Sequence, residues 1–136
     1  MKKGWILSYN VVMCGIILIG IYGCPSQEPT LPGNDPELVG KWQGSGAGYS
    51  NLSVEFRSDG SFTISGSGGS QQSFTNYGSW TTDELQLPKW INVVNQYGIT
   101  WLGIYEINGD SLKWYEQTGS RPTAFGGANE YQFTKQ

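Results

Sequence analysis

The feature that most constrains this chain is the alternation of apolar and polar residues in short runs. From Leu38 to the C-terminus these runs are interrupted by Gly, Asn or Asp about every ten residues. No segment of this region shows the 3.6-residue repeat of an amphipathic helix. Short strands at regular spacing are typical of antiparallel sandwiches and barrels. The sequence therefore predicts an all-β domain over residues 38–136.

The first hairpin is predicted over Leu52–Ile64, around a three-residue loop that ends at Gly60. A loop of this length needs a residue with positive φ in its last position, which suits glycine. The register that follows places apolar residues on one face and polar residues on the other. It pairs Phe56 with Phe62 and Val54 with Ile64.

A second hairpin is predicted over Ile99–Gln117, with its turn at Asn108-Gly109-Asp110-Ser111. Its register places large apolar residues opposite one another on the inner face and opposite charges on the outer face. A slip of one residue would reverse both faces, so the pattern specifies the register. The predicted pairs are Ile107 with Leu112, Tyr105 with Trp114, and Glu106 with Lys113.

With four further strands, the domain closes naturally into a barrel. These strands are predicted at Leu38–Gly44, Phe74–Thr81, Trp90–Val94 and Glu130–Lys135. Consecutive antiparallel strands leave no free edge when the sheet closes, so we expect a small up-and-down barrel of about eight strands. At this size the interior is either filled or holds one small ligand. Inward rings would fill on the order of 1,600 Å², which favours a shallow mouth over a large cavity.

The first 23 residues are predicted to be an export signal. Lys2 and Lys3 precede an apolar stretch from Trp5 to Tyr22, and Cys24 follows directly after Gly23. A transmembrane anchor is the alternative, because the apolar stretch is just long enough to span a bilayer.

Residues 24–37 are predicted to form a tether. Prolines at positions 25, 29, 32 and 36 disfavour both helix and sheet. Such a segment runs extended at roughly 3 Å per residue, which gives a reach of about 40 Å.

Charge and residue types exclude several functions. Without Lys2 and Lys3, six basic residues remain against eleven acidic ones, and this negative charge disfavours nucleic acid as a partner. The chain has no histidine and only two cysteines, at positions 14 and 24, which excludes histidine catalysis and Cys/His zinc sites. No carboxylates converge by register. We therefore expect a protein that is not an enzyme, with no catalytic residue, metal site or cofactor.

The end of the apolar stretch resembles the lipobox of bacterial lipoproteins. In that family a small residue precedes a cysteine that is lipidated and becomes the mature N-terminus, and Gly23-Cys24 fits this pattern. The resemblance implies lipidation of Cys24, with the bilayer as partner and the cell envelope as location. Pro25 is not the aspartate associated with inner-membrane retention, which favours the outer membrane.

The domain itself resembles a lipocalin-like domain that recurs in planctomycete proteins. Gly40-Lys41-Trp42 has the G-x-W form that opens lipocalin barrels. The motifs P-K-x-I-D, G-I-Y-x-x-D-G-D-x-L and R-P-x-x-F are matched in order, with asparagine in place of aspartate at positions 92 and 108. The matching segments are Pro88–Asn92, Gly103–Leu112 and Arg121–Phe125. The resemblance implies a lipocalin-like barrel and does not by itself imply an activity.

The same resemblance implies that Trp42 plugs one end of the barrel under an arginine, for which Arg121 is the candidate. For Trp42, contact with a ligand is the alternative to this plugging or core-packing role. Arg121 is held extended by the proline that follows it, so it is also a candidate clamp for an anionic group on a ligand.

Three aromatic residues of the second hairpin, Trp101, Tyr105 and Trp114, share one face and are candidates for a ligand-binding platform. Trp90 is a possible neighbour, and the alternative is that all of these rings form the core. Glu116 continues the same face, and as a buried carboxylate it needs a partner. We expect it at a barrel end near Arg121 or water.

Two functions follow from these expectations. In the first, a membrane-anchored extracytoplasmic lipoprotein binds a small apolar or glycan-derived ligand inside its barrel. In the second, a filled barrel acts as a protein-interaction module or an inhibitor of an envelope enzyme through its surface loops. A monomer is expected in both.

Overall fold

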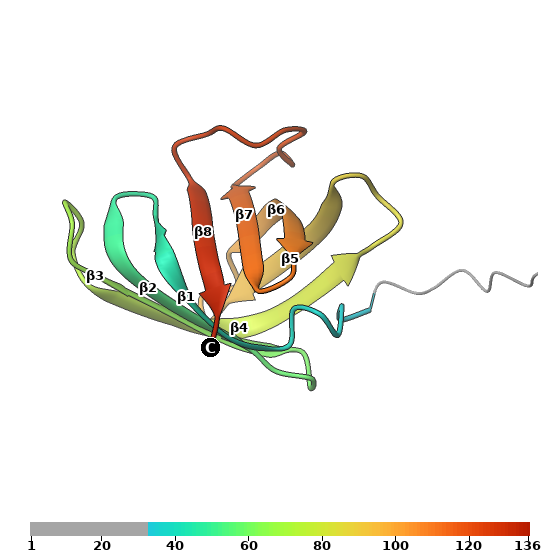
Figure 1. Cartoon of the computed structure of the whole chain (residues 1–136), viewed down its shortest axis with the longest axis horizontal. Coiled ribbons are helices and arrows are strands. Elements are labelled where there is room, and N and C mark those ends of the chain that lie inside the picture. The colour runs from blue at the N-terminus through green and yellow to red at the C-terminus, as the bar shows by residue number, and fades with distance from the viewer. Residues whose placement is uncertain (1–32) are drawn as a thin grey trace, which may run out of the picture. The chain divides into compact units, whose positions relative to one another are not determined.

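The computed structural model describes residues 33–136, which form eight β-strands (Figure 1). The strands are β1 (Gly40–Gly46), β2 (Tyr49–Phe56), β3 (Ser61–Ser67), β4 (Phe74–Asp83), β5 (Lys89–Asn95), β6 (Thr100–Asn108), β7 (Ser111–Gln117) and β8 (Glu130–Lys135).

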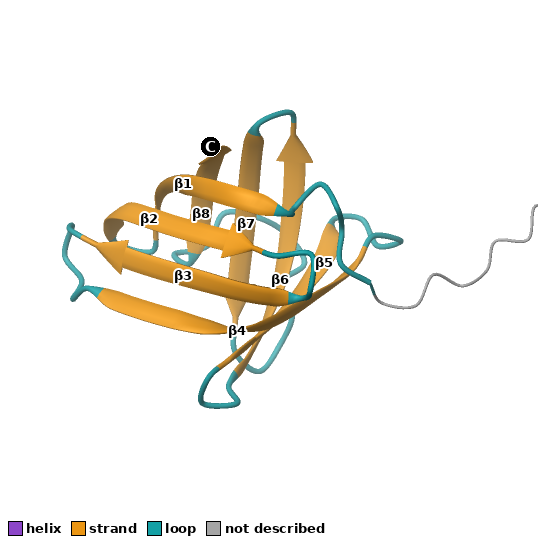
Figure 2. Cartoon of the chain, turned by 90° about the horizontal axis from the view of Figure 1, so that it is seen from below, coloured by secondary structure: helices purple, strands orange, loops and turns teal. Residues whose placement is uncertain are grey.

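Each strand pairs antiparallel with the next along the chain, and β8 pairs with β1 to close the barrel (Figure 2). The prediction of an all-β, up-and-down antiparallel barrel of eight strands is therefore confirmed. Within residues 33–136 no helix is long and apolar enough to cross a membrane.

Both predicted hairpin registers are confirmed. Phe56 pairs with Phe62 in the first hairpin, where Gly60 has a φ of 81°. Tyr105 pairs with Trp114 in the second hairpin. The outer pair Glu106 and Lys113 is also in register, although the Lys113 ammonium lies over the ring of Phe125, 5.3 Å from its centroid.

The core consists of the side chains that alternate inward along the strands. A strand directs successive side chains to opposite faces, so every second residue enters the interior. Three tryptophans, Trp42, Trp80 and Trp114, are among the largest side chains that are fully buried. Phe56 links two of them, with its ring centroid 5.1 Å from that of Trp80 and 5.8 Å from that of Trp114. The part of the interior that holds these rings is thereby filled.

The two ends of the barrel differ in how they are covered. The loops β2–β3, β4–β5 and β6–β7 lie at one end together with residues 33–39, and we call this the closed end. The loops β1–β2, β3–β4, β5–β6 and β7–β8 lie at the other end, which we call the open end. In Figure 1 the long β7–β8 loop is at the top, above β7 and β8.

The chain joins the barrel earlier than the predicted start of the domain at Leu38. Gly33 forms an isolated bridge with Thr82, and the backbone N–H of Asp35 donates to the Thr82 hydroxyl at 2.9 Å. Residues 33–37, predicted as the end of the tether, are thus packed on the closed end. The sequence of these residues gave no sign of this, because the contacts are made to residues nearly 50 positions away. The predicted signal peptide, Cys24 and the remainder of the tether lie outside the described residues.

Candidate functional site

A cavity of about 380 Å³ opens at the open end of the barrel. Its floor includes Ile64 and Trp114, above the filled part of the interior. Polar residues form part of its wall, and two of them, Thr118 and Asn129, are the first and last residues of the β7–β8 loop. The lining residues are Tyr49, Ile64, Phe74, Asn76, Trp101, Trp114, Glu116, Gln117, Thr118, Asn129 and Tyr131.

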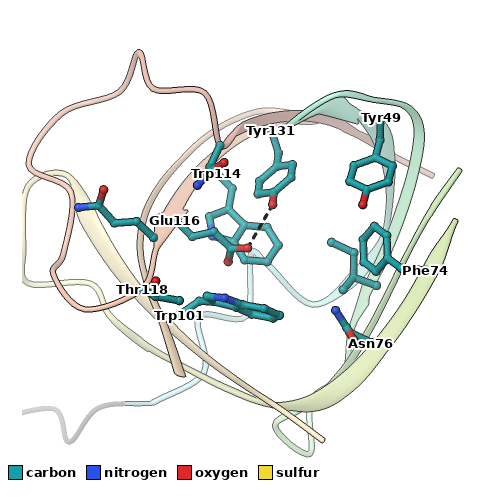
Figure 3. Close-up of a pocket in the computed structure, with 11 residues that line it drawn as sticks. Tyr49, Phe74, Asn76, Trp101, Trp114, Glu116, Thr118 and Tyr131 are labelled. Carbon is teal, nitrogen blue, oxygen red and sulfur yellow. Dashed lines mark hydrogen bonds between the residues drawn. The ribbon is translucent and has the colours of Figure 1, made fainter. Parts of the chain in front are cut away.

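Five aromatic rings give the cavity its shape. Figure 3 shows Tyr49 and Phe74 on one wall, facing Glu116 and Tyr131 on the other. The rings of Tyr49 and Phe74 lie 4.8 Å apart, and those of Trp114 and Tyr131 lie 5.4 Å apart, both with tilted planes. These distances are typical of favourable aromatic pairs. The two walls are therefore braced by packing on each side of the open space.

Glu116 is the one carboxyl group in the lining of this cavity. The residue is only 7% exposed, and its Oε1 accepts a hydrogen bond from the Tyr131 hydroxyl at 3.2 Å. Its Oε2 is buried without a partner among the described residues. Burial raises the pKa of Glu116 to about 8, against the smaller opposing effect of the Tyr131 hydrogen bond. The free cavity therefore holds a carboxyl group that is mostly protonated at neutral pH.

The indole of Trp114 reaches the cavity floor over Gly103, the cross-strand partner of Glu116 on β6, which has no side chain. A Cβ on Gly103 would lie 2.8 Å from the indole Nε1 of Trp114 and 3.0 Å from the backbone oxygen of Tyr115. The indole N–H is buried without a partner in the described part of the chain. An unpaired buried donor carries a desolvation cost of ~1–3 kcal/mol. The buried indole N–H at the cavity floor therefore lowers the stability of the fold.

Of the three predicted platform residues, Trp101 and Trp114 line the cavity but Tyr105 does not. Four residues along a strand span about 13 Å, so Trp101 and Tyr105 lie toward opposite ends of β6. The prediction that Tyr105 belongs to the ligand platform is thus wrong. A shared face ensures only that both side chains point inward, not that they reach the same depth.

Tyr105 instead belongs to a hydrogen-bonded cluster at the closed end. Its hydroxyl donates to Oδ2 of Asp35 at 2.7 Å, and the Lys89 ammonium donates to the same oxygen at 2.9 Å. The backbone N–H of Glu37 donates to the other oxygen, Oδ1, at 2.8 Å. Burial alone would raise the pKa of Asp35, but these hydrogen bonds outweigh it and hold the pKa below its usual value.

Arg121 lies outside the barrel, and the prediction that it covers Trp42 is wrong. Its guanidinium stacks on the ring of Trp90, 4.5 Å from the centroid, and donates to the backbone oxygens of Ile91 and Gly103 and to the side chain of Asn92. Trp90 is on the outer face because its neighbour Ile91 points inward. Arg121 therefore fastens the β7–β8 loop to the outside of β5 and β6, and it does not line the cavity.

Trp42 is completely buried at the closed end. Its indole Nε1 donates to the backbone oxygen of Leu38 at 2.8 Å. The cation above its ring is Lys135, whose Nζ lies 5.0 Å from the ring centroid. The same ammonium donates to the backbone oxygen of Glu37 at 3.0 Å. Lys135 rather than Arg121 occupies this position because β8 is the hydrogen-bonded neighbour of β1.

The sequence reasoning missed four important lining residues, Tyr49, Phe74, Asn76 and Tyr131. Strand alternation offered a signal for Tyr131, which is two positions from the inward Phe133 on the same strand. Phe74 and Asn76 are on β4, where the outward Thr75 separates them. Their convergence with Glu116 depends on barrel closure, because β4 and β7 are not neighbours in the sheet. The predicted partner of Glu116 was Arg121 or water, and in the structure Tyr131 occupies that place.

The donor set does not favour a metal ion. Residues 33–136 contain no group of three or more Asp, Glu, His or Cys side chains that could coordinate one.

Comparison of the chain with models of known protein families, with curated proteins and with solved structures finds no match. The site geometry is therefore the basis for a functional assignment.

Proposed function

We propose that this protein is a lipid-anchored, non-enzymatic binding module of the cell envelope that takes a small ligand into the open end of its barrel. The observation that carries the proposal is one cavity that combines five aromatic rings with a buried carboxyl oxygen that has no hydrogen-bond partner in the described part of the chain. Binding sites for small molecules are typically concave and mostly apolar, with a few placed polar groups. The cavity has this composition.

The size of the cavity limits the ligand. A volume of about 380 Å³ is near the lower end of the ~300–1,000 Å³ usual for ligand pockets. The filled core under Trp114 prevents a long acyl chain from passing deeper into the barrel. The ligand class that fits is a single ring or a short chain with an apolar or glycan-derived body and one polar group.

The proposed anchor is Cys24. Its support is the lipobox resemblance of Gly23-Cys24 at the end of an apolar stretch. Several acyl chains on one residue hold a small domain at a membrane, since each buried CH₂ contributes about 0.8 kcal/mol. The motifs that resemble the lipocalin-like family support the barrel form of the domain that this anchor would carry. Palmitate labelling that persists in Cys24→Ser would contradict this part of the proposal.

Binding is tested by tryptophan fluorescence with a panel of short fatty acids, aromatic alcohols, aromatic amines and muropeptides. Trp101→Ala removes a ring from the cavity, so we expect at least about tenfold weaker binding of any ligand that the wild type takes. Tyr77→Ala is the control because Tyr77 is an aromatic residue on the outer face of β4, 58% exposed, and this variant should bind normally. The absence of any saturable change across the panel would refute the binding function.

One observation favours the second candidate, a protein-interaction module. Leu85 and Leu87 in the β4–β5 loop are 69% and 95% exposed, and exposed apolar groups that are close together commonly mark contact surfaces. This loop is at the closed end, away from the cavity. The double variant Leu85→Ser/Leu87→Ser should abolish capture of an envelope partner and leave the fluorescence titrations unchanged if this function operates. Capture that survives the double variant excludes this loop as the contact.

A further inference from the structure

The most informative group in the cavity is the unpartnered Oε2 of Glu116. A buried polar atom is nearly always hydrogen-bonded, and Glu116 satisfies only its other oxygen, through Tyr131. In Figure 3 the carboxyl group points into the space between Tyr131 and Trp101. The cavity thus presents a preformed position for one ligand atom that hydrogen-bonds to a carboxyl oxygen.

The rings around Glu116 favour a positive charge at that position. The faces of aromatic rings are electronegative and attract cations, and rings grouped into a cage are a common way of binding ammonium groups. Trp101, Tyr131 and Trp114 line the cavity together with Glu116, and Tyr49 and Phe74 complete the ring of aromatic groups. A cation in this space would contact ring faces and the carboxyl group at once.

The lining discriminates against an anionic ligand. Among the eleven lining residues, all within the described part of the chain, none has a basic side chain. Arg121, the basic residue predicted for this role, is engaged with Trp90 and the backbone of Gly103 on the outside of the barrel. A fatty acid carboxylate would therefore meet Glu116 with no counter-ion to offset its loss of hydration.

We infer that the cavity binds a protonated primary amine on a small apolar or aromatic body, with the ammonium donating to Oε2 of Glu116 among the faces of Trp101 and Tyr131. An amine with N–H groups fits better than a quaternary ammonium, because only the former donates the hydrogen bond that Oε2 lacks. This inference rests on the proposed function, since it names the ligand class for the same cavity.

Binding of the amine is coupled to loss of a proton. The protonated carboxyl group of Glu116 gives its proton to solvent, and the carboxylate that remains pairs with the ammonium. The other titratable groups that face this site are Tyr131 on β8 and Tyr49 on β2. Burial raises the pKa of Tyr131, and Glu116 is the group whose charge changes. Below pH 8 the affinity should therefore rise about tenfold per pH unit.

The test uses four probes with nearly the same body. They are 2-phenylethylamine, its neutral counterpart 2-phenylethanol, the anion 3-phenylpropionate, and the quaternary phenethyltrimethylammonium. Calorimetric titrations at pH 6.5 in buffers of different ionisation enthalpy measure the protons released. We expect the amine to bind tightest, with close to one proton released at pH 6.5 and close to none at pH 9.

Two variants separate charge from shape. Glu116→Gln keeps the size and hydrogen-bonding capacity of the side chain but cannot ionise, so amine affinity at pH 8 should fall about 10- to 100-fold while affinity for the alcohol is unchanged. Glu106→Gln is the matched control on the exposed outer face of β6 and should bind all four probes as the wild type does. The proton release by the wild type is an independent readout if Glu116→Gln does not fold.

The outcomes distinguish the inference from the proposed function. If no probe binds, the proposed function loses its support along with the inference. If the alcohol or the acid binds at least as tightly as the amine, or if Glu116→Gln leaves amine affinity intact, the cavity is a ligand site but the amine assignment is wrong. Equal or tighter binding of the quaternary probe would overturn the hydrogen bond to Oε2.

Discussion

The two ends of this barrel each contain a buried acidic side chain, and the two side chains differ in their hydrogen bonding and in the direction of their pKa shift. Asp35 at the closed end is 1% exposed and receives hydrogen bonds from Tyr105, Lys89 and the backbone of Glu37. Glu116 at the open end is buried almost as well, but among residues 33–136 its side chain has a single hydrogen-bond partner, Tyr131. The pKa of Asp35 is lowered and that of Glu116 is raised. A buried carboxyl group with several hydrogen-bond partners stabilises the fold. A buried carboxyl group with an unpaired oxygen leaves a hydrogen-bonding position for a ligand.

The packing around the two acids also differs: it is complete at the closed end and incomplete at the open end. At the closed end Trp42 is fully buried and hydrogen-bonded, and residues 33–39 cover it. At the open end Trp101 lines a cavity and is only partly buried. We therefore expect substitutions at the closed end to affect mainly stability, and substitutions at the open end to affect mainly binding.

The largest expected effect is that of Trp42→Ala, which should lower the free energy of unfolding by about 3–5 kcal/mol because it opens a large hole in a filled region. Trp101→Ala is the comparison at the open end and should cost only ~1–2 kcal/mol, since that ring is partly exposed. Urea unfolding at pH 7 measures both. Equal losses at the two positions would mean that the ends do not differ in packing.

The next largest loss of stability is expected when Asp35, the hydrogen-bonded acid at the closed end, is replaced. Asp35→Ala leaves Tyr105 and Lys89 without their partner and should cost about 2–4 kcal/mol, less than a fully buried pair because the Lys89 ammonium is partly exposed. Asp110→Ala, in the exposed β6–β7 turn, is the control and should change stability by less than about 0.5 kcal/mol. The folded-state pKa of Asp35 is below its unfolded value of 3.8. Its contribution is therefore complete above that pH and should disappear in more acidic solution.

Glu116, the acid with an unpaired oxygen, should make stability depend on pH in the opposite direction. The folded-state pKa of Glu116 is about 8 against an unfolded value of 4.5, so the folded protein binds the proton more tightly. Stability is then greatest below about pH 4.5 and falls as the pH rises to 8. Glu116→Gln stays neutral and should be more stable than the wild type at pH 9 by ~1–3 kcal/mol, reduced by access of water to the cavity. Unfolding curves at pH 4 and pH 9 check this, and a variant that is less stable at both would show that the carboxylate is paired.

An effect of about the same size is expected in the β2–β3 loop at the closed end. Gly60 has a φ of 81°, and a Cβ there would lie 3.0 Å from the end of the Asn34 side-chain amide. Gly60→Val should cost about 1–3 kcal/mol because a β-branched residue resists this conformation. Gly109→Val, also at positive φ but with open space around it, isolates the backbone strain from the contact with Asn34. Melting temperatures that agree for the two variants would indicate that strain alone sets the cost.

Much of the fold was predictable from local patterns. The pairing of Phe56 with Phe62 follows from a loop of three residues and an alternating sequence, and both constraints act over fewer than ten positions. Burial of Glu116 was predictable in the same way, because it continues the inward face of Trp114. The parts of the site that were not predictable connect distant positions, such as Tyr49 and Phe74 opposite Glu116, or Arg121 on Trp90.

The sequence by itself determined the strands, their registers and which side chains point inward, because alternation and turn chemistry are short-range properties of the chain. Only the tertiary structure decided the depth of each inward residue along the barrel axis and the neighbours it meets across the interior. Tyr105 and Trp101 share a strand face yet serve opposite ends, and Asp35 belongs to the barrel through partners 54 and 70 positions away. The physical reason is that closure brings together strands that are not sequence neighbours. Packing across the closed interior then determines which of the two buried acids finds hydrogen-bond partners for both oxygens.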